Sequence, residues 1–209
     1  MTDQLGLRER KKLRMGELIS ETAVALFLRY GFDRVSVADV AAAAEVSKKT
    51  VFNYFPSKED LVLYPIRDHV DEPARVAGSR TAGESPIAAL RRHFVAGLEA
   101  GDPITGLADY SEFLAFQRMV MGTPSLKLRL MEQWINSEDS LAHALAEALG
   151  ESPDAIAPRA LASQIIAVQR TLTVRNVERM LAGSRPADIL AECTAEAELA
   201  FDLLEKSLT

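Results

Sequence analysis

Apolar residues recur three and four positions apart along most of the chain, which is the spacing of one face of an α-helix. From about Arg8 to Tyr30 they form one such stripe, and Gly31 follows as a natural helix stop. No segment alternates apolar and polar residues as a half-buried strand would. The sequence therefore predicts an all-α protein.

Three serines then recur at intervals of about ten residues, each just before a short helical pattern. Ser36, Ser47 and Ser57 have the side chain that caps a helix N-terminus, and acids follow Ser36 and Ser57 within the first turn. The helices they begin are too short to be stable alone. We expect all three to pack on the long helix that precedes them.

Prolines mark the helix starts in the remaining two thirds. A capping residue precedes proline at Ser85–Pro86, Asp102–Pro103 and Thr123–Pro124, which predicts helices five, six and seven. Helix eight enters near Pro153 and Pro158 and ends at Met180 or Leu181, and helix nine follows Pro186. Residues 74–84 are small or polar and predict a loop, and Pro65 is expected to kink the fourth helix. The total is about nine helices.

Composition excludes several classes of protein. Of 209 residues, 48% are hydrophobic and 26% charged, as in ordinary globular proteins, and no apolar run is long enough to span a membrane. The N-terminus lacks the apolar core of a signal peptide, so a cytoplasmic protein is expected. The single Cys193 predicts a buried thiol.

The sequence contains no recognisable catalytic or metal-binding motif. His69, His93 and His143 are too scattered for a metal motif. No glycine-rich phosphate loop and no nucleophile motif occurs. We therefore predict a protein that is not an enzyme and that has no cofactor.

Charge is unevenly distributed. Residues 1–60 carry ten basic against nine acidic side chains, whereas the rest of the chain carries fourteen against twenty-one. An acidic protein with a net charge of −6 can still bind DNA where its basic groups gather on one face, because phosphate attraction is local. The basic groups that would form this face are Arg8, Arg10, Lys11, Lys12, Arg14, Lys48, Lys49 and Lys58.

The stretch from Ala41 to Val62 reads AAAAEVSKKTVFNYFPSKEDLV and has the pattern of a helix-turn-helix followed by a second capped helix. It resembles the DNA-reading segment of the tetracycline-repressor (TetR) family. The resemblance implies three N-terminal helices that bind DNA and a helical remainder that binds an effector and dimerises. We accordingly expect a DNA-binding domain with an N-terminal arm at residues 1–56. An effector and dimerisation domain at 57–209 would follow, with helix four, 57–72, as connector and Pro65 as its hinge.

In this geometry the second helix of the motif lies in the major groove. Val51 and Phe55 would face the core, leaving the other side of the helix for DNA. The resemblance implies Thr50, Phe52 and Tyr54 as DNA contacts and Lys58 as a phosphate clamp. The complete set of predicted contacts is Ser36, Ser47, Lys48, Lys49, Thr50, Phe52, Asn53, Tyr54 and Lys58.

Two positions depart from the family pattern. Lys49 stands where glycine is usual and adds a long cation at the groove, and Phe52 replaces a tyrosine and cannot donate a hydrogen bond to phosphate. Phe52 can still contact a thymine methyl. We expect a base preference different from the common type.

The resemblance implies a homodimer through helices eight and nine. Apolar stripes support this, although either stripe could instead pack internally. Their members are Leu161, Ile165, Val168, Leu172 and Val177 in helix eight, and Leu190, Cys193, Ala197, Ala200, Phe201, Leu204 and Leu208 in helix nine.

The resemblance also places an effector pocket inside helices five to eight. Large apolar side chains are plentiful there, although such stripes more often form plain core. An arginine in the pocket would favour a carboxylate ligand, so a small lipophilic and acidic effector is preferred. The candidate lining residues are Phe94, Leu98, Phe113, Phe116, Gln117, Met131, Trp134 and Arg170.

The sequence thus predicts a dimeric repressor that binds a palindromic double-stranded DNA operator and is released by a small molecule. The first alternative is a helical DNA-binding protein without an effector, whose core would lack a ligand-sized cavity. The second is a small-molecule-binding helical protein with a decayed DNA head. The operator, the effector, the regulated genes, the sign of regulation and the number of dimers on one operator are beyond the sequence.

Overall fold

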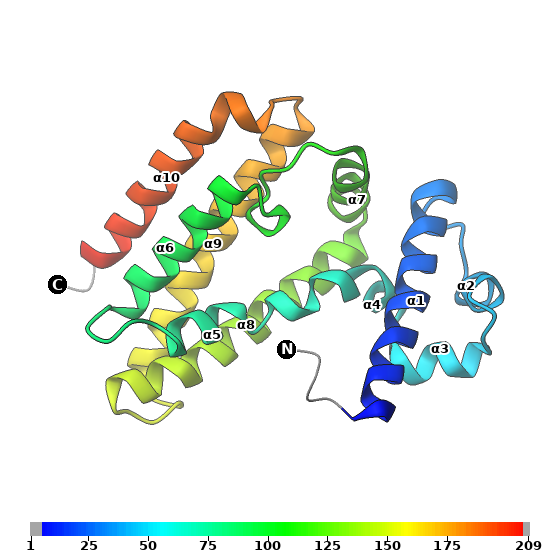
Figure 1. The fold of residues 1–209 in the computed structure, drawn as a ribbon, viewed down its shortest axis with the longest axis horizontal. Coiled ribbons are helices and arrows are strands. Elements are labelled where there is room, and N and C mark those ends of the chain that lie inside the picture. The colour runs from blue at the N-terminus through cyan, green and yellow to red at the C-terminus, as the bar shows by residue number, and fades with distance from the viewer. Residues whose placement is uncertain (1–5, 207–209) are drawn as a thin grey trace. The chain divides into compact units, whose positions relative to one another are not determined.

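The computed structural model describes residues 6–206, and this part of the chain contains helices and no strand. The all-helical prediction is confirmed (Figure 1). The elements are α1 Leu7–Tyr30, α2 Val37–Ala43, α3 Lys48–Tyr54, α4 Lys58–Leu63, the 3-10 helix η2 Tyr64–His69, α5 Glu72–Gly78, α6 Pro86–Ala100, the 3-10 turn η3 Pro103–Thr105, α7 Ser111–Gly122, α8 Pro124–Leu149, α9 Ile156–Leu181 and α10 Pro186–Lys206.

The fold divides into two compact units. The first, here called the head, contains the residues up to Arg67 together with Arg118–Leu130. The second, here called the body, contains Asp68–Gln117 and the residues from Met131 onward. The predicted boundary between residues 56 and 57 separates DNA reading from effector binding, and it stays a prediction.

All three predicted serine caps are confirmed. Ser36 and Ser57 each close a reciprocal capping box, in which the serine hydroxyl accepts from the backbone N–H three residues on and that residue's carboxylate accepts from the serine. Ser47 accepts from the Thr50 N–H at 3.0 Å. Helices of six or seven residues are marginal in water, so these caps and the packing below them hold the head together.

The head packs α2 and α4 against α1, and α3 against α2. Ser20 of α1 is buried and donates a hydrogen bond to the Leu61 carbonyl of α4 at 2.8 Å. The fully buried side chains of the head include Ile19, Ala23, Phe27, Val40, Val51, Phe55, Leu61, Val62 and Leu63 of α1 to α4 and the segments between them, and Val120 and Leu126 of α7 and α8.

Tyr64 links the end of α3 to α1. Its ring meets the Phe55 ring edge-on at 5.1 Å, and the Arg67 guanidinium lies 3.4 Å from its ring centre. Its hydroxyl reaches α1 at Gly16, where a Cβ would lie only 2.4 Å from the oxygen. Glycine at position 16 therefore makes room for the tyrosine.

Asp60 joins α4 to the first turns of α8 within the head. One carboxylate oxygen closes the capping box with Ser57, and the other accepts from Arg129 Nε at 2.8 Å and Nη2 at 2.7 Å. The Asp60 side chain is only 15% exposed, so this pair is better shielded than a surface ion pair.

The body is built on α6, α9 and α10. α10 packs against both α6 and α9, and α5 covers another side of α6. The core side chains of these helices include Leu90, Phe94, Leu98, Ile165, Leu172, Cys193, Ala197 and Phe201. Ion pairs flank this core, because Arg91 of α6 contacts Glu198, Asp202 and Glu205 of α10.

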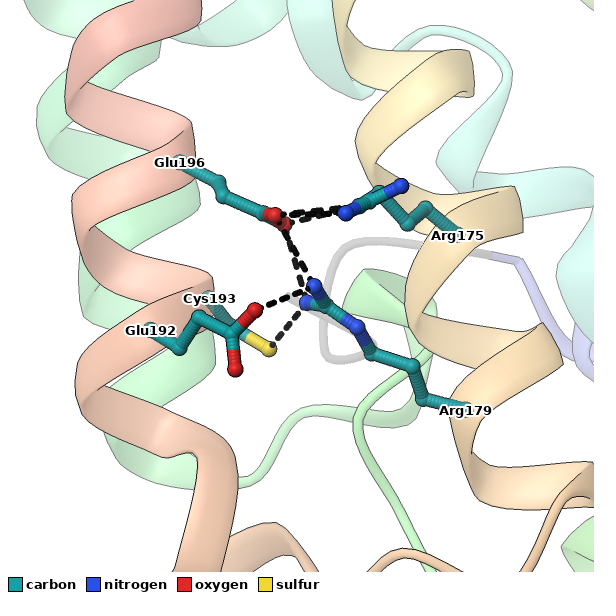
Figure 2. A network of polar contacts seen from close by, with 5 residues as sticks. All are labelled: Arg175, Arg179, Glu192, Cys193 and Glu196. Carbon is teal, nitrogen blue, oxygen red and sulfur yellow. Dashed lines mark hydrogen bonds and ion pairs between the residues drawn. The ribbon is translucent and has the colours of Figure 1, made fainter.

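A second ionic cluster joins α9 to α10 (Figure 2). Arg175 and Arg179 both bind Glu196, and Arg179 also reaches Glu192 and the Cys193 sulfur. Hydrogen bonds from Arg175, then Arg179, lower the pKa of Glu196, so its charge is secure. Burial raises the pKa of the Cys193 thiol, in agreement with the predicted buried thiol.

Three predicted elements come out differently. The fourth helix does not run from 57 to 72 as one α-helix, because α4 ends at Leu63 and Pro65, which lacks an N–H, lies in η2. The predicted loop 74–84 is shorter, since α5 occupies Glu72–Gly78 and buries Ala77. Asp102–Pro103 starts only the turn η3, which Gly106 ends at φ 80°, and the next helix starts at Ser111.

We expect Gly16→Ala to destabilise the protein by about 1–3 kcal/mol, because the new methyl group forces Tyr64 away from its place between α1 and Phe55. Urea denaturation measures this. Gly78→Ala is the control, since a Cβ there meets nothing within 4 Å and alanine favours a helix. Equal stability of the two variants would show that the Tyr64 contact is unimportant.

Candidate nucleic-acid interface

α3 has one buried face and one open face. Val51 is 1% exposed and Phe55, just past its end, 2% exposed, whereas Lys48, Lys49 and Asn53 are exposed. The two buried residues are four positions apart and share one face of the helix, as the helical spacing predicts, and the exposed residues lie on the other face. The open face combines cations, an amide and an aromatic ring, which are groups that can contact phosphates and base edges.

Phe52 is 46% exposed, so its ring is accessible to a partner. The Lys48 ammonium lies 5.8 Å from its ring centre, within the range of a cation–π contact. The pair presents a cation beside an apolar ring on the surface. Such a pair suits a phosphate or guanine next to a thymine methyl.

Ser47 and Thr50 occupy the N-terminal turn of α3. Their hydroxyl oxygens lie 2.8 Å apart, and the Ser47 hydroxyl also caps the Thr50 N–H. Tyr54 is partly buried, with its ring centre 6.3 Å from that of Phe55. The structure therefore gives Ser47 a structural role beside any contact with DNA.

Ser36 and Lys58 lie at the starts of α2 and α4. Ser36 is exposed, and hydrogen bonds from its hydroxyl, then from its backbone N–H, lower the pKa of Asp39. The Lys58 ammonium donates to the Phe32 carbonyl and lies 4.2 Å from the Phe32 ring centre and 5.3 Å from that of Phe27. Lys58 is thus already engaged in the head, with further N–H donors available to a phosphate.

The first turns of α1 add positive charge to the head. Five basic side chains lie within Arg8–Arg14, and all five are exposed. Their exposure fits both a solvated charge run and a phosphate-binding surface.

The predicted effector residues include both buried core residues and residues of an open groove. Phe94 and Leu98 are buried in the core of the body, where the ring centres of Phe94 and Phe201 lie 6.3 Å apart. Phe113 is buried as well, beside Tyr110. Phe116 and Gln117 of α7 are partly buried.

Met131, Trp134 and Arg170 do come together. They line a groove of about 510 Å³ between α8 and α9, with Thr171, Val174, Arg175 and Glu178 as the other lining residues. Sequence reasoning missed these four, although Val174 and Glu178 follow Arg170 at intervals of four on the same helix. That spacing was the available signal.

The apolar stripes predicted for dimerisation pack inside the body instead. Ile165, Leu172 and Val177 of α9 are buried, as are Cys193, Ala197, Phe201 and Leu204 of α10. The prediction for these residues was wrong because the same stripe serves the core of one chain. Leu208 lies outside the described residues.

The opposite side of α10 is apolar and open. Leu199 is 59% exposed and Leu203 is 60% exposed, and Ala191 and Ala195 precede them at intervals of four residues. These four residues are here called the α10 outer stripe. A stripe of this kind on a helix is a candidate protein interface.

The described residues hold no group of three or more potential metal ligands. Among them, no helix is both long and apolar enough to cross a membrane.

Two family models match the chain. "Bacterial regulatory proteins, tetR family" matches residues 19–64, and "MftR C-terminal domain" matches residues 84–206. The first covers most of the head helices and the second most of the body.

Curated relatives point the same way. The chain is 33% identical over 172 residues to the HTH-type transcriptional regulator TcmR of Streptomyces glaucescens, covering 80% of this chain and 75% of TcmR. It is 30% identical over 118 residues to the HTH-type transcriptional repressor DhaR of Mycobacterium sp. strain GP1, covering 55% of this chain and 59% of DhaR.

Among solved structures, the chain is similar to FadR of Thermus thermophilus, a TetR family transcriptional repressor in complex with lauroyl-CoA. The TM-score is 0.53 at 20% identity, covering 93% of this chain and 95% of FadR. This likeness shows the fold.

Ser47→Asp tests the placement of α3. Aspartate caps a helix as well as serine does, so stability is expected to hold, but its charge repels phosphate, and operator affinity should fall about tenfold or more at low salt. Fluorescence anisotropy with labelled operator DNA, alongside urea denaturation, separates the two effects.

Ser85→Asp is the matched control, because Ser85 caps α6 in the body by the same kind of hydrogen bond, from the Ala88 N–H. It should leave DNA binding unchanged. If both variants bind operator like the unmodified protein, the N-terminus of α3 does not lie at the DNA.

Proposed function

The chain belongs to the tetR family of DNA-binding transcriptional regulators, and from this premise we propose that it is a homodimeric repressor of a palindromic operator, released by a small-molecule effector. Its family and relatives are regulators rather than enzymes. The observation that carries the proposal is the capped helix α3, whose buried face fixes it in the head and whose open face is basic and polar.

The proposed DNA contacts are those predicted from the sequence. Lys48, Lys49 and Asn53 are exposed and free to reach base edges, while Thr50 and Tyr54 flank them. Ser36 and Lys58 stand at the neighbouring helix starts and would contact phosphates. Lys49 and Phe52 give this head its own base preference.

A homodimer would fit a palindromic operator, because two heads related by a twofold axis would contact two half-sites. We assign the dimer contact to the α10 outer stripe rather than to the buried stripes of α9 and α10. The small side chains of Ala191 and Ala195 would allow two helices to approach closely.

Repression is favoured because DhaR, 30% identical over its matched region, is a transcriptional repressor. The effector is proposed to be small, lipophilic and acidic. FadR, which has the same fold, holds the acyl-CoA lauroyl-CoA. Such an effector needs only a higher affinity for the form of the dimer that does not fit the operator.

Helix α4 and η2 would connect body and head, with Pro65 in η2 as the hinge. Since the operator DNA of a bacterial regulator lies in the cytoplasm, the protein would act there. The alternative without an effector is tested by the binding experiment on the groove at Trp134. The alternative with a decayed head is disfavoured by the intact caps and the exposed lysines.

Titration against the DNA upstream of its own gene, at two salt concentrations, tests the head. We expect tight binding that weakens with salt, and loss of binding in the double variant Thr50→Ala, Tyr54→Ala. Lys58→Gln should reduce the slope of log K against log salt by about one, because the phosphate contact proposed for Lys58 disappears. Weak binding that is indifferent to these changes would support the decayed head.

The dimer is tested by Leu199→Glu combined with Leu203→Glu. Charges without partners in the contact should weaken the dimer by roughly 3 kcal/mol or more, as measured by sedimentation equilibrium. Leu149→Glu, at a similarly exposed leucine at the end of α8, is the control. An unchanged dimer in the double variant would place the contact elsewhere.

A further inference from the structure

The groove between α8 and α9 has the composition of a ligand site. It is an open groove on the surface of the body, with a volume of about 510 Å³. Met131, Trp134 and Val174 supply apolar and aromatic surface, and three charged side chains lie around them. All the lining residues belong to the body.

Arg170 is the charged residue of the groove whose guanidinium N–H donors are not engaged. It is partly buried, and its guanidinium lies 5.5 Å from the centre of the Trp134 ring. Within residues 6–206 its guanidinium makes neither a hydrogen bond nor an ion pair, and the ring contact is its one polar interaction. A guanidinium with open donors in a groove is suited to bind a carboxylate with two parallel hydrogen bonds.

Arg175 lines the same groove but is already neutralised. Its guanidinium binds both oxygens of Glu196, each 3.0 Å from Nε, and Nη2 reaches the same carboxylate at 2.9 Å (Figure 2). Hydrogen bonding to Glu196 raises its pKa further. The groove thus contains two arginines, of which Arg175 is paired with a carboxylate and Arg170 is not.

Glu178, the third charged residue of the groove, determines which way round an anionic ligand would lie. Arg170, Val174 and Glu178 follow one another at intervals of four along α9, so Glu178 stands about 12 Å from Arg170 along the helix. A carboxylate is attracted at the Arg170 end and repelled at the Glu178 end. The apolar part of a ligand would then lie over Trp134 and Val174.

We propose that this groove binds a small aromatic monocarboxylate, with the carboxylate on Arg170 and the ring against Trp134 and Val174. Three residues of the predicted effector set, Met131, Trp134 and Arg170, line this groove, whereas Phe94 and Leu98 are buried in the core of the body. The proposal rests on the proposed function only for its regulatory meaning, since it gives the effector a chemical class and a place.

Binding is measured on the full-length protein without DNA. The probes are biphenyl-4-carboxylate and the uncharged biphenyl-4-carboxamide, which have nearly the same shape. Calorimetry should give an affinity about tenfold or more higher for the carboxylate, because a charge-assisted pair is added. Trp134 is the single tryptophan of the chain, so its emission should change on binding.

Two variants locate the anion. Arg170→Gln should remove the preference for the carboxylate, whereas Arg175→Gln should keep it, because Glu196 already occupies Arg175. Urea denaturation checks that both fold. Should Arg170→Gln fail to fold, Arg170→Lys replaces it and should retain part of the preference, since the charge remains.

Several results would overturn the proposal. They are equal affinity for acid and amide, no binding of either probe, unchanged Trp134 emission on binding, or a preference that depends on Arg175 instead of Arg170. Operator titration without probe tests the proposed function separately. A head that fails to bind DNA therefore leaves the calorimetric result readable, and an empty groove leaves DNA binding intact.

Discussion

The exposed face of α3, which is proposed to contact DNA, depends on three short helices that are not stable in isolation. Helices α2, α3 and α4 have six or seven residues each, which is below the length at which an isolated helix holds in water. Their serine caps satisfy backbone N–H groups that would otherwise be left open, and the buried faces do the rest. Every exposed side chain of α3 owes its position to Ser47 at one end and to buried Val51 and Phe55 beneath.

Local signals explain what could be predicted. Serine before an acid, and proline after a capping residue, fix helix starts through contacts within one turn, so Ser36, Ser57 and Pro86 were informative. Helix α5 was missed because its stability comes from packing Ala77 against α6, which a local pattern does not reveal. Glu45, between α2 and α3, adopts φ 56°, a value that propensity alone would assign to glycine or asparagine.

The candidate site residues likewise divide into those that local sequence predicts and those that depend on packing between distant segments. The open face of α3 follows from helical spacing, since Val51 fixes the orientation of its neighbours. The groove does not, because Trp134 and Arg170 come from helices that meet only in the folded body. The sequence showed that Cys193 belongs to an apolar stripe, but it did not show which surface the stripe packs against. In the structure the stripe faces the core of the body.

Asp60 holds two partners with one carboxylate, the capping box of α4 through one oxygen and Arg129 of α8 through the other. Such a residue is constrained from two sides in evolution. A replacement at position 60 that keeps the cap but loses the charge gives up the ion pair with Arg129, and a change at 129 cannot restore a lost cap. Substitutions at the two positions are therefore expected to depend on each other, with Asp60 the slower to vary among close relatives.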